Sequence, residues 1–223
     1  MNWDSIILSL KLAMVTSIIL FLIGVPIAKR MHQSRSPAMG FIEALISLPL
    51  VLPPTVLGFY LLLAFSPNSA FGAFVQQKMG VDLLFSFPGL VIASVIYSLP
   101  FMIQPLKTGF GNVPLAYSEA SHVLGKSRLK TLLKVELPNM KSAILTAFTL
   151  TFAHTLGEFG VVLMIGGNIP GVTRVASIAI YDDVESMNYV AANQNALALL
   201  LISFAILILV YSFSRKYTVR MFQ

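Results

Sequence analysis

Long runs of apolar residues, separated by shorter polar segments, dominate the pattern along this chain. A helix that crosses a bilayer needs about 20 mostly apolar residues. Five segments meet this requirement, at about residues 5–28, 41–65, 84–106, 142–165 and 196–213. The pattern therefore predicts an all-α integral membrane protein with five transmembrane helices, folded as a single transmembrane domain over residues 1–223. The longest polar connection, residues 107–141, joins the third and fourth spans.

Composition agrees with a membrane location. Of the 223 residues, 57% are hydrophobic and 11% are charged, whereas an ordinary soluble domain is about 45–50% apolar and about 25% charged. The chain has no cysteine, which excludes thiolate metal sites and thiol catalysis. Its first four residues, Met1-Asn2-Trp3-Asp4, lack the basic region of a cleaved signal peptide. We therefore expect the first span to be retained.

The distribution of charge predicts how the spans are oriented. Most of the 15 Lys and Arg residues lie in segments 29–40 and 107–141 and in the tail after the fifth span. Because cytoplasmic loops carry the excess of Lys and Arg, the N-terminus is expected outside and the C-terminus inside. The net charge of +6 is then a topology signal, and no nucleic-acid binding is predicted. On the outer side, Asp182, Asp183 and Glu185 either contact a partner or form a solvated face.

The second span contains prolines where a regular helix cannot hold them. Pro49, Pro53 and Pro54 fall within six positions, and each removes an amide donor and clashes with the preceding turn. Irregular backbone near the middle of a bilayer is tolerated only against protein or a water-filled cavity, and broken helices often line substrate paths in transporters. With Ser47 and Thr55 beside them, these prolines are candidates for a translocation path or gate. The alternative is a plain proline kink.

The fourth span carries two ionisable residues, His154 and Glu158. They are four positions apart, so in one helix they share a face. Ionisable residues within a span are functional candidates by default, although a structural His–Glu pair, or a Glu158 bonded to a neighbouring helix, is an equal alternative. Gly157 and Gly160 would let a neighbouring helix approach closely. We count all four residues as gate candidates.

The connection 107–141 is expected on the cytoplasmic side as two short helices. Asn112 and Pro114 suit the start of the first helix and Gly125 its end. Ser127 would cap a second helix that runs to about Leu137 before Pro138. The first helix has one apolar arc, formed by Leu115, Ala116, Ala120, Val123 and Leu124. Such a helix either docks in a partner's groove or lies on the membrane surface.

This connection resembles the EAA motif of ABC importer permeases. The motif reads Glu-Ala-Ala, three residues, Gly, nine residues, Ile, one residue, Leu-Pro. The matching positions, with Ser for Ala and Val for Ile, are Glu119, Ala120, Ser121, Gly125, Val135, Leu137 and Pro138. The resemblance implies a type I-like ABC importer permease, in which this coupling helix fits a cleft of an ATPase subunit and couples ATP hydrolysis to transport. Glu119 and Gly125 would be its most sensitive positions.

Three further stretches narrow the resemblance to molybdate permeases, and these are residues 47–60, 156–160 and 167–171. Sulfate permeases share related segments, so the oxyanion class is firmer than the ion. The resemblance implies partners that are a second copy of this chain, two cytoplasmic ABC ATPase subunits and a periplasmic oxyanion-binding protein. The complex would lie in the bacterial inner membrane, with ATP and magnesium bound by the ATPase and no cofactor on this chain.

Two other functional classes remain as alternatives. A channel or secondary transporter would need no ATPase partner. A membrane-embedded enzyme would have to use His154 and Glu158, but two ligands fall short of the three that catalytic zinc usually has, so no metal site and no catalytic residue is predicted. The chain also lacks a glycine-rich nucleotide-binding loop of the Walker type. Any ATP that drives it must therefore bind a partner.

Overall fold

The computed structural model describes residues 2–34 and 36–219, and these residues form helices joined by turns and loops. Arg35 and Arg220, two basic residues of the segments expected inside, lie outside the described residues. The helices in the first half of the chain are α1 (Trp3–Gln33), α2 (Pro37–Ser47), the short 3-10 turn η1 (Leu48–Leu50), α3 (Pro54–Phe65), α4 (Ala70–Met79) and α5 (Phe87–Gly111). The second half contains α6 (Leu115–Val123), α7 (Arg128–Thr131), the π-helical turn η2 (Leu132–Glu136), α8 (Leu137–Asn139), α9 (Lys141–Leu156), α10 (Gly160–Gly166), α11 (Ala176–Glu185) and α12 (Tyr189–Val219).

Three helices of the described chain are long and apolar enough to cross a membrane, namely α1, α5 and α12. Two further pairs meet the same test together but are bent. The chain bends by 108° between the segment Pro37–Leu50 and α3, and by 58° between α9 and α10. If each bent pair is one span, the described chain has up to five crossings. The predicted break in segment 41–65 is therefore confirmed. The prediction of one uninterrupted helix over 142–165 is wrong, because the helix stops at Leu156 and restarts at Gly160.

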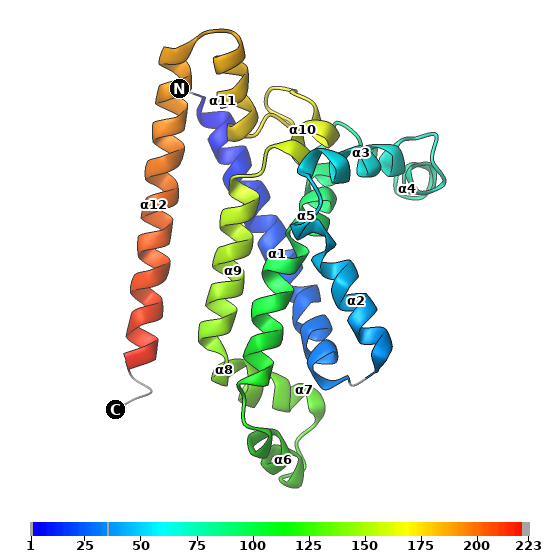
Figure 1. Cartoon of the computed structure of the whole chain (residues 1–223), viewed down its shortest axis with the longest axis vertical. Coiled ribbons are helices and arrows are strands. Elements are labelled where there is room, and N and C mark those ends of the chain that lie inside the picture. Colours follow the sequence, from blue (N-terminus) through cyan, green and yellow to red (C-terminus); the bar gives the residue numbers. More distant parts are fainter. Residues whose placement is uncertain (1, 35, 220–223) are drawn as a thin grey trace.

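The centre of the bundle is α1, which packs along α5 and α9 (Figure 1). Its buried face carries small residues at intervals of mostly four positions, which are Ser5, Ser9, Ala13, Ser17, Gly24 and Ala28. Small side chains let membrane helices approach closely and gain contact over their whole length. At Gly24, an added Cβ atom would lie 3.0 Å from the Met102 side chain of α5. The spacing of small residues thus fixes which face of α1 meets the bundle.

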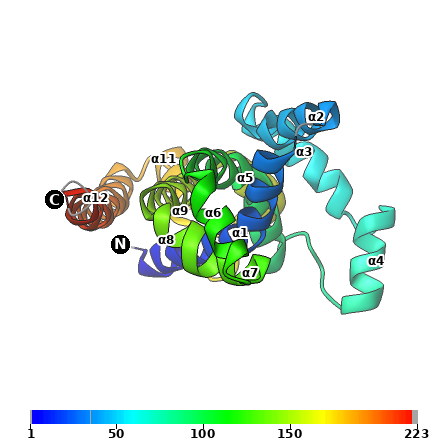
Figure 2. The same ribbon diagram turned by 90° about the horizontal axis from the view of Figure 1, so that it is seen from below.

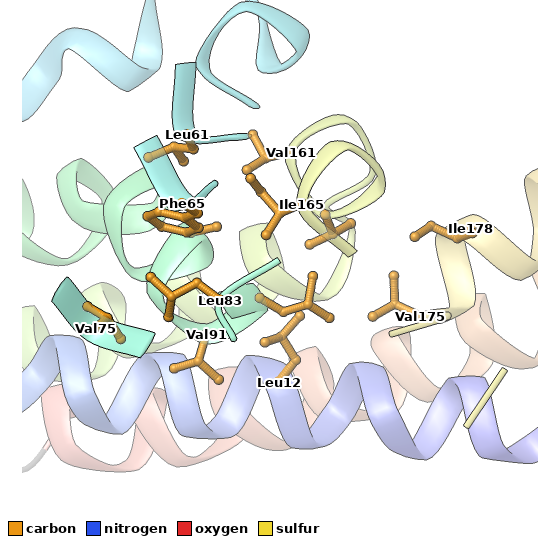
Figure 3. Packing of buried hydrophobic residues seen from close by; sticks show 13 residues of the cluster. Leu12, Leu61, Phe65, Val75, Leu83, Val91, Val161, Ile165, Val175 and Ile178 are labelled. Atoms are coloured by element: carbon orange, nitrogen blue, oxygen red, sulfur yellow. The ribbon is translucent and has the colours of Figure 1, made fainter. Parts of the chain in front are cut away.

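The two short helices that follow the bends pack on each other. Leu61 and Phe65 of α3 lie in one apolar cluster with Val161 and Ile165 of α10 (Figure 3). Gly58 allows this contact, because a Cβ atom there would lie 3.3 Å from the backbone of Val161. The halves of the second and fourth predicted spans beyond their breaks therefore form one unit.

Two parts of the chain stand away from this centre, on opposite sides of it (Figure 2). One is α12, which contacts α9 and α11. The other is formed by α2 and α4, on either side of the packed helix α3. Along the bundle, α6, α7 and α8 lie at one end, whereas α11 and the N-terminus lie at the other (Figure 1). The basic connection and the acidic outer segment are thus separated by the length of the bundle, as the charge pattern predicts.

Candidate functional site

The first helix of the connection, α6, ends in a hydrogen-bonded turn that needs glycine. Gly125 has φ +70°, a conformation that only glycine adopts readily. Its amide donates to the carbonyl of His122 at 2.9 Å, and the amide of Lys126 donates to the carbonyl of Ser121 at 3.1 Å. These two bonds form a Schellman motif. The prediction that Gly125 ends the helix is confirmed, whereas Asn112 caps the end of α5 rather than starting α6.

The second helix of the connection begins at the predicted cap. The Ser127 hydroxyl accepts a hydrogen bond from the amide of Lys130. The helix then runs through α7, the π-helical turn η2 and α8 to Asn139, so the prediction that it ends before Pro138 is wrong by two residues. Pro138 lies in the first turn of α8, where its missing amide hydrogen costs little.

The two faces of α6 have opposite surroundings. The apolar face is largely uncovered in the single chain, and Leu115, Val123 and Leu124 are 72%, 87% and 73% exposed. The polar face points inward, where the Ser121 hydroxyl bonds the Thr131 hydroxyl at 2.9 Å and is buried. An exposed apolar face on an otherwise polar segment is typical of a surface that binds another protein. Among the other motif residues, Glu119, Ala120, Gly125 and Pro138 are exposed, and Val135 and Leu137 are half-buried.

A residue that the sequence analysis did not single out links this connection to the bundle. Glu136 is 6% exposed, and its Oε2 accepts a hydrogen bond from the Nζ of Lys29 at 2.5 Å. Its other oxygen accepts from the hydroxyl of Ser118 at 3.0 Å. One signal could have found it, because a carboxylate between the apolar Val135 and Leu137 needs a partner when buried.

In the second predicted span, the residues before the break are held by α5. The Nε2 of Gln104 donates to the hydroxyl of Ser47 at 2.9 Å. About one helical turn after Gln104 in α5, the Nζ of Lys107 pairs with Oε1 of Glu43 at 2.5 Å. Gln104 is a further polar contact that the sequence analysis missed. Of the predicted gate residues here, Pro49 is buried, whereas Pro53, Pro54 and Thr55 are exposed.

In the fourth predicted span, the two ionisable residues contact α5 separately. Glu158 follows the end of α9, so the prediction that it shares a helix face with His154 is wrong. The hydroxyl of Ser94 donates to Oε2 of Glu158 at 2.9 Å. The hydroxyl of Ser98 lies 3.0 Å from Nδ1 of His154. Ser94 and Ser98 are four positions apart, so one face of α5 holds both sides of the break.

Aromatic rings hold His154 in place from α5. Its ring stacks on Phe101 with centroids 4.0 Å apart and lies 4.7 Å from the ring of Tyr97. Glu158 is 5% exposed, and its Oε1 has no hydrogen-bond partner among the described residues. Both side chains are therefore packed within the bundle in this conformation.

The two helix breaks meet at Gly160. A Cβ atom at this position would lie 2.7 Å from the Cβ of Pro54, so glycine is required for the close approach that the sequence predicted. Gly157 has a different role, since it lines a separate apolar groove of about 310 Å³ between α1, α9 and α12. The structure thus brings Pro54, Thr55 and Gly160 into contact. His154 and Glu158 pack against α5, and Gly157 lies in the separate groove.

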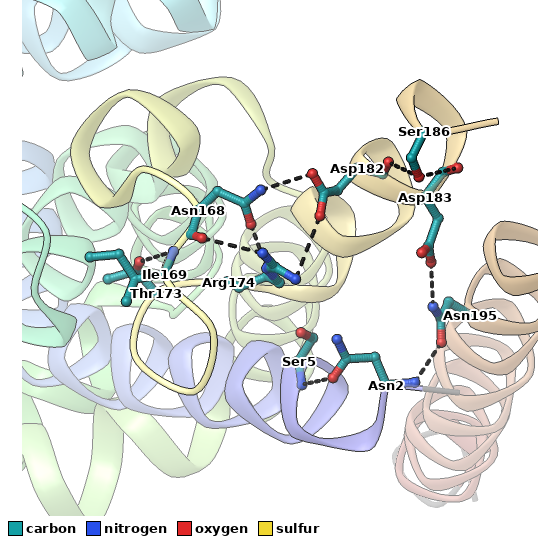
Figure 4. A network of polar contacts seen from close by, with 10 residues as sticks. All are labelled: Asn2, Ser5, Asn168, Ile169, Thr173, Arg174, Asp182, Asp183, Ser186 and Asn195. Carbon is teal, nitrogen blue, oxygen red and sulfur yellow. Dashed lines mark hydrogen bonds and ion pairs between the residues drawn. The ribbon is translucent and has the colours of Figure 1, made fainter. Parts of the chain in front are cut away.

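The acidic residues of the outer end are engaged within the chain (Figure 4). Asp182 pairs with Arg174 at 3.5 Å and accepts a hydrogen bond from Asn168. Asp183 accepts a hydrogen bond at 2.7 Å from Asn195 of α12, and the Asn195 side chain in turn accepts one from the amide of Asn2 at 2.8 Å. These contacts tie α11, α12 and the N-terminus together. The carboxylates of Asp182 and Asp183 therefore serve the fold, whereas Glu185 is exposed.

Solved ABC transporters contain chains with the same fold. A chain of the MetNI methionine ABC transporter matches with a TM-score of 0.73 and 16% identity, covering 96% of this chain and 95% of that one. A chain of a bacterial alginate ABC transporter, in complex with an alginate pentasaccharide-bound periplasmic protein, matches with a TM-score of 0.77 and 16% identity over 96% of this chain and 78% of its own. At such low identity these matches establish the fold alone.

Relatives of known name are closer in sequence. The molybdenum transport system permease protein ModB of Azotobacter vinelandii is 46% identical over 211 residues, which cover 94% of this chain and 92% of the relative. The sulfate transport system permease protein CysT of Salmonella typhimurium is 32% identical over 89% of this chain and 72% of its own length. ModB of Escherichia coli is 29% identical over 83% and 81% of the two chains.

A family model matches nearly the whole chain, over residues 20–219, and its description is binding-protein-dependent transport system inner membrane component. The match includes the connection with the EAA motif and both helix breaks. The chain therefore belongs to this family and is a membrane-embedded permease component of the ABC transporter class.

Proposed function

We propose that this chain is the permease subunit of an ATP-driven importer that carries molybdate into the bacterial cytoplasm. The observation that carries this proposal is the 46% identity to a molybdenum transport permease over 94% of this chain and 92% of the relative. The nearly complete coverage of both chains supports the proposal, because the aligned part of this chain amounts to nearly all of its predicted spans and connections.

Sulfate is the second candidate ion. Identity does not separate the two ions cleanly, since the sulfate relative at 32% lies above one molybdenum relative at 29%. Length favours molybdate, because this chain covers 92% of the first molybdenum permease but only 72% of the sulfate permease. Tungstate has the same charge and a similar size, so we expect it to compete with molybdate.

The assembly we propose has two copies of this chain, two ATPase subunits and a periplasmic binding protein in the inner membrane. Each chain crosses the membrane several times, with its N-terminus outside and its C-terminus inside, as the distribution of Lys and Arg supports. The exposed apolar face of α6 is the surface that docks on the ATPase. ATP and magnesium bind that partner, and this chain catalyses no reaction.

Transport follows from coupling α6 to the broken helices. Closure of the ATPase pair on ATP displaces α6, and the covalent path through α7, η2 and α8 leads directly into α9 and its break. ATP and the loaded binding protein then favour the outward-open state because they bind it more tightly. Hydrolysis returns the bundle to the inward-open state.

The path itself is proposed along the face where the breaks meet. Pro53, Pro54 and Thr55 are exposed on the single chain next to Gly160. Irregular backbone there cannot face lipid without leaving polar groups unpaired, so a second copy or a water-filled path must cover it. An anion would meet backbone and hydroxyl groups, which favours passage over tight capture.

Uptake by the purified complex tests the proposal. The permease, the ATPase and the binding protein are reconstituted in vesicles, and entry of labelled molybdate is measured with and without ATP. We expect ATP-dependent entry that unlabelled tungstate reduces strongly and unlabelled sulfate reduces weakly. Stronger competition by sulfate than by tungstate would transfer the assignment to sulfate. Entry without ATP would favour a channel or a secondary transporter.

A further inference from the structure

Glu136 joins three parts of the chain that are distant in sequence. It belongs to η2, its partner Ser118 belongs to α6, and Lys29 lies near the end of α1. Each carboxylate oxygen has its own donor, at 2.5 Å from Lys29 and 3.0 Å from Ser118. The side chains of Lys29 and Glu136 are 19% and 8% exposed, although most residues of the connection around them face solvent.

Packing between α1 and this connection is incomplete, because Leu132 and Leu137 pack against the apolar cluster that contains Met31 of α1, whereas α6 does not belong to that cluster. A cavity of about 630 Å³ lies between α1 and the connection and is lined by residues of both, including Arg30, Phe110, His122 and Leu129. The other polar contact of the inner face of α6, from Ser121 to Thr131, stays within the connection. The Lys29–Glu136–Ser118 chain of contacts therefore bridges the two elements beside this cavity.

The backbone that carries Glu136 is itself unusual. Glu136 is the last residue of the five-residue π-helical turn η2. Such turns are rare within helices and are frequent at functional sites. The wider turn sets the direction of the residue that follows Val135 in the EAA-like motif. It thereby directs the carboxylate of Glu136 towards α1. The EAA motif leaves the residue type at this position open.

We propose that Glu136 is a positioning residue that makes α6 and the inner end of α1 move as one body. Displacement of α6 then reaches α1 through Ser118, Glu136 and Lys29, in parallel with the covalent path into α9. The inference rests on the proposed coupling of α6 to an ATPase, and it adds a second route by which that motion enters the bundle. Since α1 packs along α5 and α9, and α5 in turn packs on α10, this route reaches the helices on both sides of the break after Leu156.

Distances within the complex test whether α1 follows α6. The chain contains no cysteine, so spin labels are placed at Gln33→Cys of α1 and His122→Cys of α6 without removing native thiols. The assembled complex in vesicles is measured with and without ATP. We expect one narrow distance distribution that ATP leaves unchanged. Glu136→Gln, Lys29→Met and Ser118→Ala should each broaden it and make it depend on ATP.

Transport gives the second readout, as ATP hydrolysed per molybdate imported. We expect this ratio to rise at least about fivefold in Glu136→Gln, the low end of typical coupling between sites. The exchanged pair Lys29→Glu with Glu136→Lys should recover part of the loss. Glu43→Gln is the matched control, because its ion pair with Lys107 has the same length and joins α2 to α5 without involving α1, α6 or η2.

Each outcome decides the inference. It is overturned if the labels show one unchanged distribution in all three variants, or if Glu43→Gln changes the ratio as much as Glu136→Gln. If Glu136→Gln does not assemble, Ser118→Ala and Lys29→Met decide alone, since each removes one contact of the bridge. If the wild type imports another ion, the proposed substrate is wrong while the label distances still test the bridge. If no ATPase binds α6, both proposals fail.

Discussion

The coupling connection and the region of the helix breaks each bury one glutamate, in different surroundings. Glu136 has both oxygens bonded, one to a lysine and one to a serine. Glu158 has one oxygen bonded to Ser94, and its other oxygen has no partner among the described residues. An ion pair thus joins Glu136 to α1, whereas a single hydroxyl contact joins the side chain of Glu158 to α5. We therefore expect the connection to move as a rigid body and the helices to bend at the breaks.

The two regions also differ in what they expose. The connection is a largely polar segment, and it exposes apolar side chains of α6 that water covers in the single chain. The break region exposes Pro53, Pro54 and Thr55, and lipid cannot satisfy irregular backbone of this kind. Both surfaces are therefore incomplete in a single chain. We expect one to be completed by the ATPase and the other by a second copy.

The largest effect is expected from Gly125→Val. Valine at φ +70° costs about 1–3 kcal/mol of backbone strain and disturbs the end of α6, the helix proposed to dock on the ATPase. We expect membrane insertion to persist while capture of the ATPase subunit and ATP-driven uptake are lost. Pulldown of the ATPase and uptake in vesicles measure both.

Gly171→Val is the matched control, because Gly171 has φ +74° and open space around it but lies in the outer segment. It should keep both activities. If both variants lose ATPase capture and uptake equally, backbone strain alone explains the result. The proposal that α6 transmits motion from the ATPase would then have no support from this experiment.

Glu119→Lys should act next most strongly. Glu119 is exposed on α6, so its reversal of charge leaves the fold intact and acts on the docked partner. We expect binding-protein-stimulated ATP hydrolysis to fall about tenfold or more, as like charges brought together in an interface cost several kcal/mol. Glu185→Lys, an exposed acid at the outer end, should leave the interaction with the ATPase unchanged. Normal stimulation in Glu119→Lys would remove this residue from the coupling surface.

Replacement of the prolines tests whether transport depends on the bend in segment 41–65. Alanine at Pro49, Pro53 and Pro54 restores amide donors and lets segment 41–65 straighten, so the 108° bend loses its cause. We expect uptake to fall at least about fivefold with a smaller change in the amount of inserted protein. Pro105→Ala is the control, because α5 continues through Pro105 without a break. Unaltered uptake by a well-folded triple variant would count against a path at the breaks.

Local rules predicted the features that depend on local chemistry. The break at Pro53 follows from missing amides, and the turn at Gly125 follows from a helix end that needs positive φ. The break after Leu156 was missed because a single glycine such as Gly157 is tolerated within a helix. The partners of Glu136 were missed because Lys29 lies 107 positions away, and only the folded bundle brings them together.

Ser94→Ala should give the smallest effect, confined to stability. It removes the hydrogen bond to Glu158 and leaves a buried carboxyl group without any partner, which costs about 1–3 kcal/mol. Thermal unfolding of the purified complex measures the change. Thr108→Ala is the control on the same helix, since its exposed hydroxyl bonds only the carbonyl of Gln104, and it should change stability by less than about 0.5 kcal/mol. Equal effects of the two variants would mean that Ser94 does not hold the break after Leu156, and the proposal that the helices bend at the breaks would rest on Pro53 and Pro54 of the other break.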